Sequence, residues 1–172
     1  MTIAQGVMIE PEIMANIGWL IMRVGIAWLF LWPLPGLLRN WHATVKTTAL
    51  VYPFPTLATA AGLVVMLCGS ISVGCGIYGR IGGAALALYC IGGAFVHMAL
   101  SRQPASLIQG LGLDGNAADV ANMAAEIGAV GHVTSAWKNW TIAGVCSFIA
   151  LAGTGPLSII QIQPLTFSRA IQ

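Results

Sequence analysis

A polar stripe on a long apolar segment is the first feature that could bind a ligand. Tyr89, Gly93 and His97 follow one another at intervals of four residues, so on a helix they share one face. The phenol and the imidazole supply a hydrogen-bonding group and a proton-exchanging group, and the glycine between them leaves a shallow notch. We therefore expect this stripe to hold the headgroup of a ligand.

If the apolar segments of this chain cross a membrane as helices, His97 falls at one membrane face, and further titratable residues are predicted at that same face. Together they are all three histidines and three acidic residues. They are His42, His97, His132, Asp114, Asp119 and Glu126. Imidazoles and carboxylates at one face are what a quinone site needs to exchange protons, or a metal site needs as ligands. No two histidines have helical i, i+3 or i+4 spacing, and only His97 falls in a predicted span. No metal and no haem are therefore expected.

Arg23 is the one formal charge well inside a predicted membrane-spanning segment. Because exposure to lipid is costly for a charge, Arg23 either faces the bundle interior or extends to the headgroups. Trp28 and Trp32 stand four apart on the same segment and share a face, which could pack in the bundle, meet lipid or line a flat hydrophobic ligand. With Tyr89 and His97, these are the five predicted cofactor-binding residues.

The composition predicts an integral membrane protein. Hydrophobic residues make up 58% of the chain, charged residues only 7%, and the mean hydropathy is +0.85, so the partner of most of the surface is the lipid bilayer rather than water. Seven basic and five acidic side chains form no basic face, which excludes nucleic acid as a partner. The four cysteines lie in apolar segments without a CxxC pair and are interpreted as packing residues.

Four segments are long and apolar enough to cross a bilayer as helices. They cover residues 17–38, 56–78, 81–100 and 140–160. Only Gly79 and Arg80 separate the second segment from the third, which predicts a tight antiparallel hairpin. Small residues spaced four apart, such as Gly79 and Gly83, predict close helix packing. The expected fold is all-α, a single membrane domain over residues 1–172 built as a bundle of four transmembrane helices.

The loop over residues 101–139 joins the third and fourth predicted spans. Within it, residues 117–130 predict a short amphipathic helix, because Val120, Met123, Ile127 and Val130 fall along one face. This helix could lie in the membrane interface, cover the mouth of the bundle or dock on another subunit. Four crossings place both termini on one side, and the distribution of Lys and Arg favours the opposite side as cytoplasmic.

Three stretches resemble the DoxX/DoxD family of small bacterial membrane proteins. Residues 22–32, MRVGIAWLFLW, resemble its Arg-containing, Phe-Leu-rich first helix. Residues 61–69 and 78–84, the latter YGRIGGA, are similar to its pattern of a Gly-rich helix, a short Arg turn and an Ala-rich helix. Residues 138–140, KNW, and 151–159, LAGTGPLSI, are similar to its closing segment. Many members carry a Gly and a Lys after the first helix, whereas residues 32–38 read WPLPGLL, without a Lys.

The resemblance implies a four-helix bundle of the bacterial inner membrane, found with quinone-linked oxidoreductases such as thiosulfate:quinone oxidoreductase. The expected function is a small membrane subunit of such a complex, which anchors other subunits, helps to bind a quinone and is not catalytic alone. The main alternative is a purely structural or assembly subunit of a larger respiratory, photosynthetic or oxygenase complex. A third class is a small solute transporter. The sequence has no Gly-rich phosphate loop, GxSxG or HExxH motif.

Overall fold

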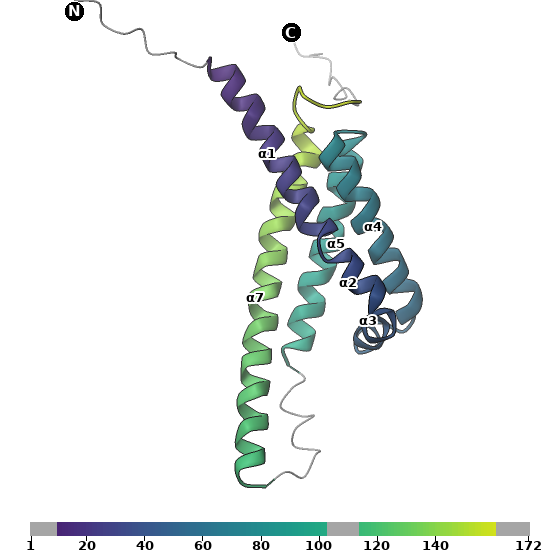
Figure 1. Ribbon diagram of the computed structural model, residues 1–172, viewed down its shortest axis with the longest axis vertical. Coiled ribbons are helices and arrows are strands. Elements are labelled where there is room, and N and C mark those ends of the chain that lie inside the picture. Colours follow the sequence, from purple (N-terminus) through teal and green to yellow (C-terminus); the bar gives the residue numbers. More distant parts are fainter. Residues whose placement is uncertain (1–9, 103–113, 161–172) are drawn as a thin grey trace, which may run out of the picture.

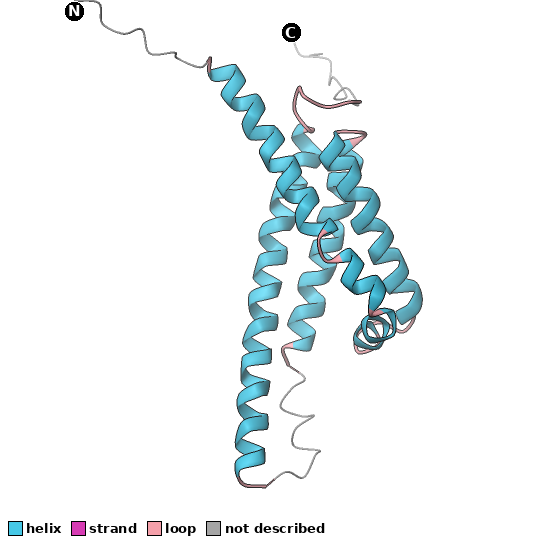
Figure 2. Ribbon diagram, viewed as in Figure 1, coloured by secondary structure: helices cyan, strands magenta, loops and turns pink. Residues whose placement is uncertain are grey.

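The protein is built from helices that pack side by side (Figures 1 and 2). A computed structural model describes residues 10–102 and 114–160. Its helices are α1 (Pro11–Leu31), α2 (Leu34–Arg39), α3 (Trp41–Thr48), α4 (Pro55–Cys75), α5 (Gly79–Leu100) and α7 (Asn116–Ala152). The described residues contain no strand beyond one isolated bridge, between Ile77 and Ile160. The prediction of an all-α fold is confirmed over this part of the chain.

Within residues 10–102 and 114–160, three helical segments are long and apolar enough to cross a membrane. They are Pro11–Arg39, which joins α1 and α2, Pro55–Cys75 and Gly79–Leu100. Large apolar side chains such as Leu57 and Ile21 are 70% and 67% exposed in the isolated chain, as expected where lipid is the solvent. The prediction of a multi-pass membrane protein with transmembrane helices is thereby confirmed.

Helices α4 and α5 form the tight hairpin predicted from the sequence. Gly76 ends α4 in the left-handed conformation, with φ of 67°, which costs glycine little. The two helices then approach closely, because a Cβ added to Gly69 would lie 2.9 Å from Cγ of Leu86. Small residues at the crossing therefore bring the backbones together, as predicted for helices in lipid.

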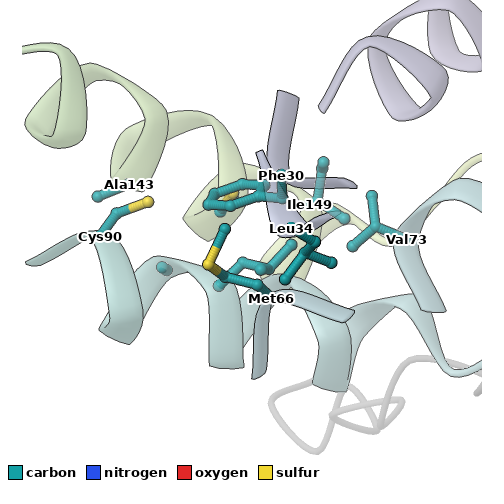
Figure 3. Packing of buried hydrophobic residues seen from close by; sticks show 10 residues of the cluster. Phe30, Leu34, Met66, Val73, Cys90, Ala143 and Ile149 are labelled. Atoms are coloured by element: carbon teal, nitrogen blue, oxygen red, sulfur yellow. The ribbon is translucent and has the colours of Figure 1, made fainter. Parts of the chain in front are cut away.

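Helix α7 runs antiparallel to α5 and closes the bundle (Figure 1). A Cβ on Gly83 of α5 would lie 2.9 Å from the carbonyl oxygen of Cys146 and 3.0 Å from the amide nitrogen of Ala150, both backbone atoms of α7. Figure 3 shows the packed core that results, to which several helices contribute. Its buried members are Phe30, Leu34, Met66, Val73, Leu86, Ala87, Cys90, Ala143, Cys146 and Ile149.

The separate short helix predicted over residues 117–130 is instead the first part of α7, a continuous helix of 37 residues. No proline interrupts this stretch, and Thr134 and Ser135 donate their hydroxyls to the carbonyl oxygens of Val130 and Gly131, which helices tolerate. At 1.5 Å per residue α7 is about 55 Å long, so its N-terminal part passes beyond the end of α5 (Figure 1).

The predicted end of the first span, near residue 38, agrees with the span Pro11–Arg39. Its helix is interrupted after Leu31, because Pro33 lacks the amide hydrogen that would continue it, and the chain resumes as α2. Two other predicted span ends differ from the structure. The second ends at Cys75 rather than at residue 78, where Gly76 caps it. The fourth ends at Ala152 rather than at residue 160, since Gly153, with φ of 92°, turns the chain back.

Candidate ligand groove

A groove with a volume of about 870 Å³ opens between α3, α4, α5 and α7, with Leu29 and Phe30 of α1 on its wall. Its size is typical of sites that bind small molecules. Along α5 the wall extends from Ala85 to His97, a rise of about 18 Å at 1.5 Å per residue. The groove is therefore long enough for an extended ligand.

The groove changes in polarity along its length. Toward the middle of the bundle its wall is apolar, with Leu63 and Met66 of α4 and Leu88 of α5. Near the C-terminal end of α5 it includes His97 together with Lys138 and Asn139 of α7. Among the described residues of the wall, Lys138 carries the only formal charge. Such a groove suits an amphipathic molecule whose headgroup accepts hydrogen bonds.

The predicted stripe of Tyr89, Gly93 and His97 lies on this wall. The Tyr89 hydroxyl is 3.1 Å from the sulfur of Met66, and its ring meets Phe30 edge-on at 6.2 Å between centroids. Gly93 leaves room for the Asn139 side chain, because a Cβ there would lie 2.9 Å from Nδ2 of Asn139 and would push the amide aside. The glycine notch thus seats the Asn139 amide at the polar end of the groove.

His97 meets His132 of α7 at this end. Their Nδ1 atoms are 3.0 Å apart and their ring centroids 5.3 Å apart. One Nδ1 must carry a hydrogen and the other accept it, since two unprotonated nitrogens cannot form this bond. Both side chains are half-buried, and His97 is on the groove wall whereas His132 is not. The structure therefore joins a groove residue to a second imidazole outside it.

The other titratable residues predicted at this face do not join the pair. His42 is exposed on α3, and Asp114, Asp119 and Glu126 are exposed along the projecting end of α7 or just before it. Within residues 10–102 and 114–160, no three His, Cys, Asp or Glu side chains form a group that could hold a metal ion.

Arg23 lies outside the groove, at the opposite end of the bundle. Only 2% of its surface is exposed. Of the two predicted alternatives, Arg23 therefore faces the bundle interior and does not extend to the headgroups. Its Nη1 donates to the Thr154 carbonyl oxygen at 3.1 Å and to Ser158 Oγ at 2.8 Å, and its Nη2 donates to the Leu157 carbonyl oxygen at 2.9 Å. Arg23 thus ties α1 to the segment that follows α7.

A second arginine holds the end of α7, directly before this segment. Arg80, at the start of α5, donates from Nη1 to the Leu151 carbonyl oxygen and from Nη2 to the Ala152 carbonyl oxygen at 3.3 Å. These carbonyls lie in the last turn of α7, where backbone acceptors lack helical partners. Ile160 N further donates to the Gly76 carbonyl oxygen at 3.1 Å. The segment after α7 is therefore fastened to the α4–α5 turn.

Trp28 and Trp32 also lie outside the groove. They are 62% and 71% exposed, and their rings contact each other with centroids 5.3 Å apart. Of the three predicted alternatives for this face, packing in the bundle is excluded, and contact with lipid or with a flat ligand outside this groove remains. Among the five predicted cofactor-binding residues, only Tyr89 and His97 are brought together on one wall.

Two groove residues, Lys138 and Asn139, were missed because they were assigned to the end of a loop. Neither side chain makes a hydrogen bond within the described residues, so both donors are available to a ligand. Their signal was present in the spacing of Ser135, Lys138 and Ile142, which lie three and four residues apart and share a helix face. Comparison of the chain with protein-family models, curated proteins and solved structures finds no match.

Proposed function

We propose that this chain is a small membrane subunit of a bacterial quinone-linked redox complex, of the DoxX/DoxD type, and that it binds a quinone in the groove. The observation that carries the proposal is the change along the groove wall, from Leu63, Met66 and Leu88 to His97, Lys138 and Asn139. A quinone has matching parts, because its apolar isoprenoid tail is joined to a flat ring with two carbonyl acceptors.

The residues at the polar end fit that ring. The Lys138 ammonium and the Asn139 amide supply donors for carbonyl oxygens, and His97 adds an imidazole that can give or accept a proton. The Tyr89 ring, fixed by Phe30, offers a flat apolar surface farther along the wall. A bound quinone would supply two-electron redox chemistry, for which another subunit must provide the electron donor or acceptor.

Helix α7 is proposed as the fourth membrane crossing, in the bacterial inner membrane. Its contacts with α5 extend from His132, beside His97, to Ala150, beside Gly83. This stretch rises about 27 Å, close to the thickness of the hydrocarbon core. Asn139 is half-buried on the groove wall, whereas Lys138 is exposed near the end of this stretch, where its long side chain can reach the headgroup level.

Cysteine labelling tests the fourth crossing. In a variant whose exposed Cys68 and Cys75 are replaced by alanine, single cysteines at Glu12 and Ile159 should react from one side of the membrane. Single cysteines at Lys46 and Arg102 should react only from the other side. Labelling of the Ile159 position from the side of Arg102 would contradict the proposal, because α7 would then not cross.

Binding of a short-chain ubiquinone to the purified chain in phospholipid nanodiscs tests the proposed function. Gly92 lies on the groove wall, and a Cβ there meets nothing closer than the Tyr52 hydroxyl at 3.9 Å. Gly92→Leu should therefore fill the groove without disturbing the fold and weaken binding at least about tenfold, or 1.4 kcal/mol. Equilibrium gel filtration, with quinone absorbance as the readout, measures the affinity.

The matched control is Gly144→Leu on α7, where an added Cβ has no neighbour within 4 Å and which is not on the groove wall. It should bind like the wild type. Equal affinities of the Gly92→Leu variant and the wild type would show that the groove is not the quinone site. Absence of binding by a folded wild-type chain would favour the structural or assembly alternative.

One observation supports both the leading proposal and that alternative. The projecting part of α7 exposes Val120, Met123, Ile127 and Val130 to between 63% and 67% of their surface. An apolar row on a helix that extends past α5 is typical of contact with another protein subunit. Both readings therefore include partner subunits, and quinone binding distinguishes them.

A further inference from the structure

The pair formed by His97 and His132 spans the wall of the groove. His97 lines the groove and His132 does not, yet the two Nδ1 atoms are within hydrogen-bond distance, at 3.0 Å. The pair lies close to the end of α5 at Leu100, so His132 is near the end of the bundle rather than at its middle. A proton held between these rings has one neighbour inside the groove and one outside it.

We propose that this pair is a proton relay and that His132 reloads His97 with protons for the headgroup end of the groove. This inference rests on the proposed function, because the headgroup is that of the quinone. It assigns a role to His132, which touches neither the groove nor the ligand and therefore acts through His97.

The relay can be written with its protons balanced. His97 begins with its hydrogen on Nε2 and accepts a hydrogen bond at Nδ1 from the Nδ1–H of His132. When His97 gives the Nε2 proton to a ligand oxygen, His132 passes its Nδ1 proton to Nδ1 of His97. His132 takes a replacement proton on its Nε2 from solvent, which is left with one hydroxide, so both rings end neutral but in exchanged tautomers. The net result is one proton carried from solvent to the ligand oxygen, and the histidines move no electron. A second cycle, after the rings return to their first tautomers, supplies the second proton of the quinol, and the electron pair comes from the oxidoreductase partner.

Lys138 is the one charged side chain on the groove wall that also holds His97, and no acidic residue lines that wall among the described residues. Lys138 could itself donate a proton to the ligand, so it is the rival source. A relay through His132 predicts slower quinone reduction in variants of His132, whereas direct donation by Lys138 predicts slower reduction in a variant of Lys138.

Two variants of His132 separate a relay from a merely structural contact. His132→Gln keeps a side-chain amide that can donate to Nδ1 of His97 but cannot exchange a proton, whereas His132→Phe removes the hydrogen bond. Bound short-chain ubiquinone in nanodiscs is mixed with dithionite, which supplies the electron pair and is oxidised to sulfite. The reduction rate is measured in H₂O and D₂O by stopped-flow absorbance.

A relay predicts that both variants bind the quinone within about twofold of the wild type but reduce it about tenfold more slowly, with a smaller solvent isotope effect. His42→Phe, at an exposed histidine of α3, should match the wild type. Histidine ¹⁵N spectra of the chain without quinone should show one protonated and one accepting Nδ1, a signature absent in His132→Phe.

Several results would overturn the relay. They are a wild-type rate in His132→Gln, an isotope effect near one in the wild type, or slowing in Lys138→Met but in neither His132 variant. Each of these leaves quinone binding, and so the proposed function, intact. A folded wild-type chain that binds no quinone overturns the proposed function instead, and the relay with it.

Discussion

Replacing Arg23 by alanine is expected to lower the free energy of unfolding by about 3 to 5 kcal/mol. The guanidinium makes three hydrogen bonds to residues 131 to 135 positions away in the sequence. Its loss leaves the buried carbonyl oxygen of Thr154 and the part-buried carbonyl oxygen of Leu157 without that donor. We expect the segment after α7 to detach and become the first site of proteolysis.

Thermal unfolding in detergent, followed by helical circular dichroism and limited proteolysis, measures this effect. Arg39→Ala, which removes the same side chain from an exposed position on α2, should change stability by less than about 0.5 kcal/mol. The stability of Arg23→Lys should lie between those of Arg23→Ala and the wild type, since one ammonium cannot replace the planar guanidinium, which donates to three acceptors. A wild-type melting curve for Arg23→Ala would show that the buried contacts contribute nothing net.

Gly83→Val is expected to separate α7 from α5 and to cost about 3 kcal/mol, the upper part of the range for overpacking. The atoms that its Cβ would meet, the Cys146 oxygen at 2.9 Å and the Ala150 nitrogen at 3.0 Å, belong to the backbone of α7. Neither can rotate away as a side chain could, so the helices themselves must move.

Gly144→Val and Gly128→Val are the matched controls, because an added Cβ at either position meets no atom within 4 Å. Both carry the same change in helix propensity, so the difference from Gly83→Val isolates the contact between α5 and α7. The melting temperatures of the three variants in one detergent provide the comparison. Equal values would mean that the two helices are not packed as closely as the structure has them.

The parts of the fold that follow from local pattern could be predicted from the sequence. The α4–α5 hairpin needed only two apolar runs separated by Gly79 and Arg80. The stripe of Tyr89, Gly93 and His97 followed from the helical period, which places residues four apart on one face. The burial of Arg23 was one of two alternatives, because burial and snorkelling produce the same pattern near a span end.

Other features depend on contacts between distant segments. The partners of Arg23 are backbone carbonyls, which every sequence has, so no residue pattern marks them. The contact between His97 and His132 depends on α7 continuing past residue 130, where the predicted amphipathic helix ended, to Ala152. Lys138 and Asn139 lie on the groove wall for the same reason, because α7 continues through residues that were assigned to a loop.

Mass spectrometry of the lipids that remain bound to the purified chain tests most directly whether the groove between α4, α5 and α7 holds a quinone. The chain is expressed in quinone-producing bacteria and extracted in mild detergent. The account predicts about one quinone for each wild-type chain, at most a tenth of that for Gly92→Leu, and the wild-type amount for Gly144→Leu. Phospholipid alone in a folded wild-type chain, or the same quinone content in both variants, would contradict it.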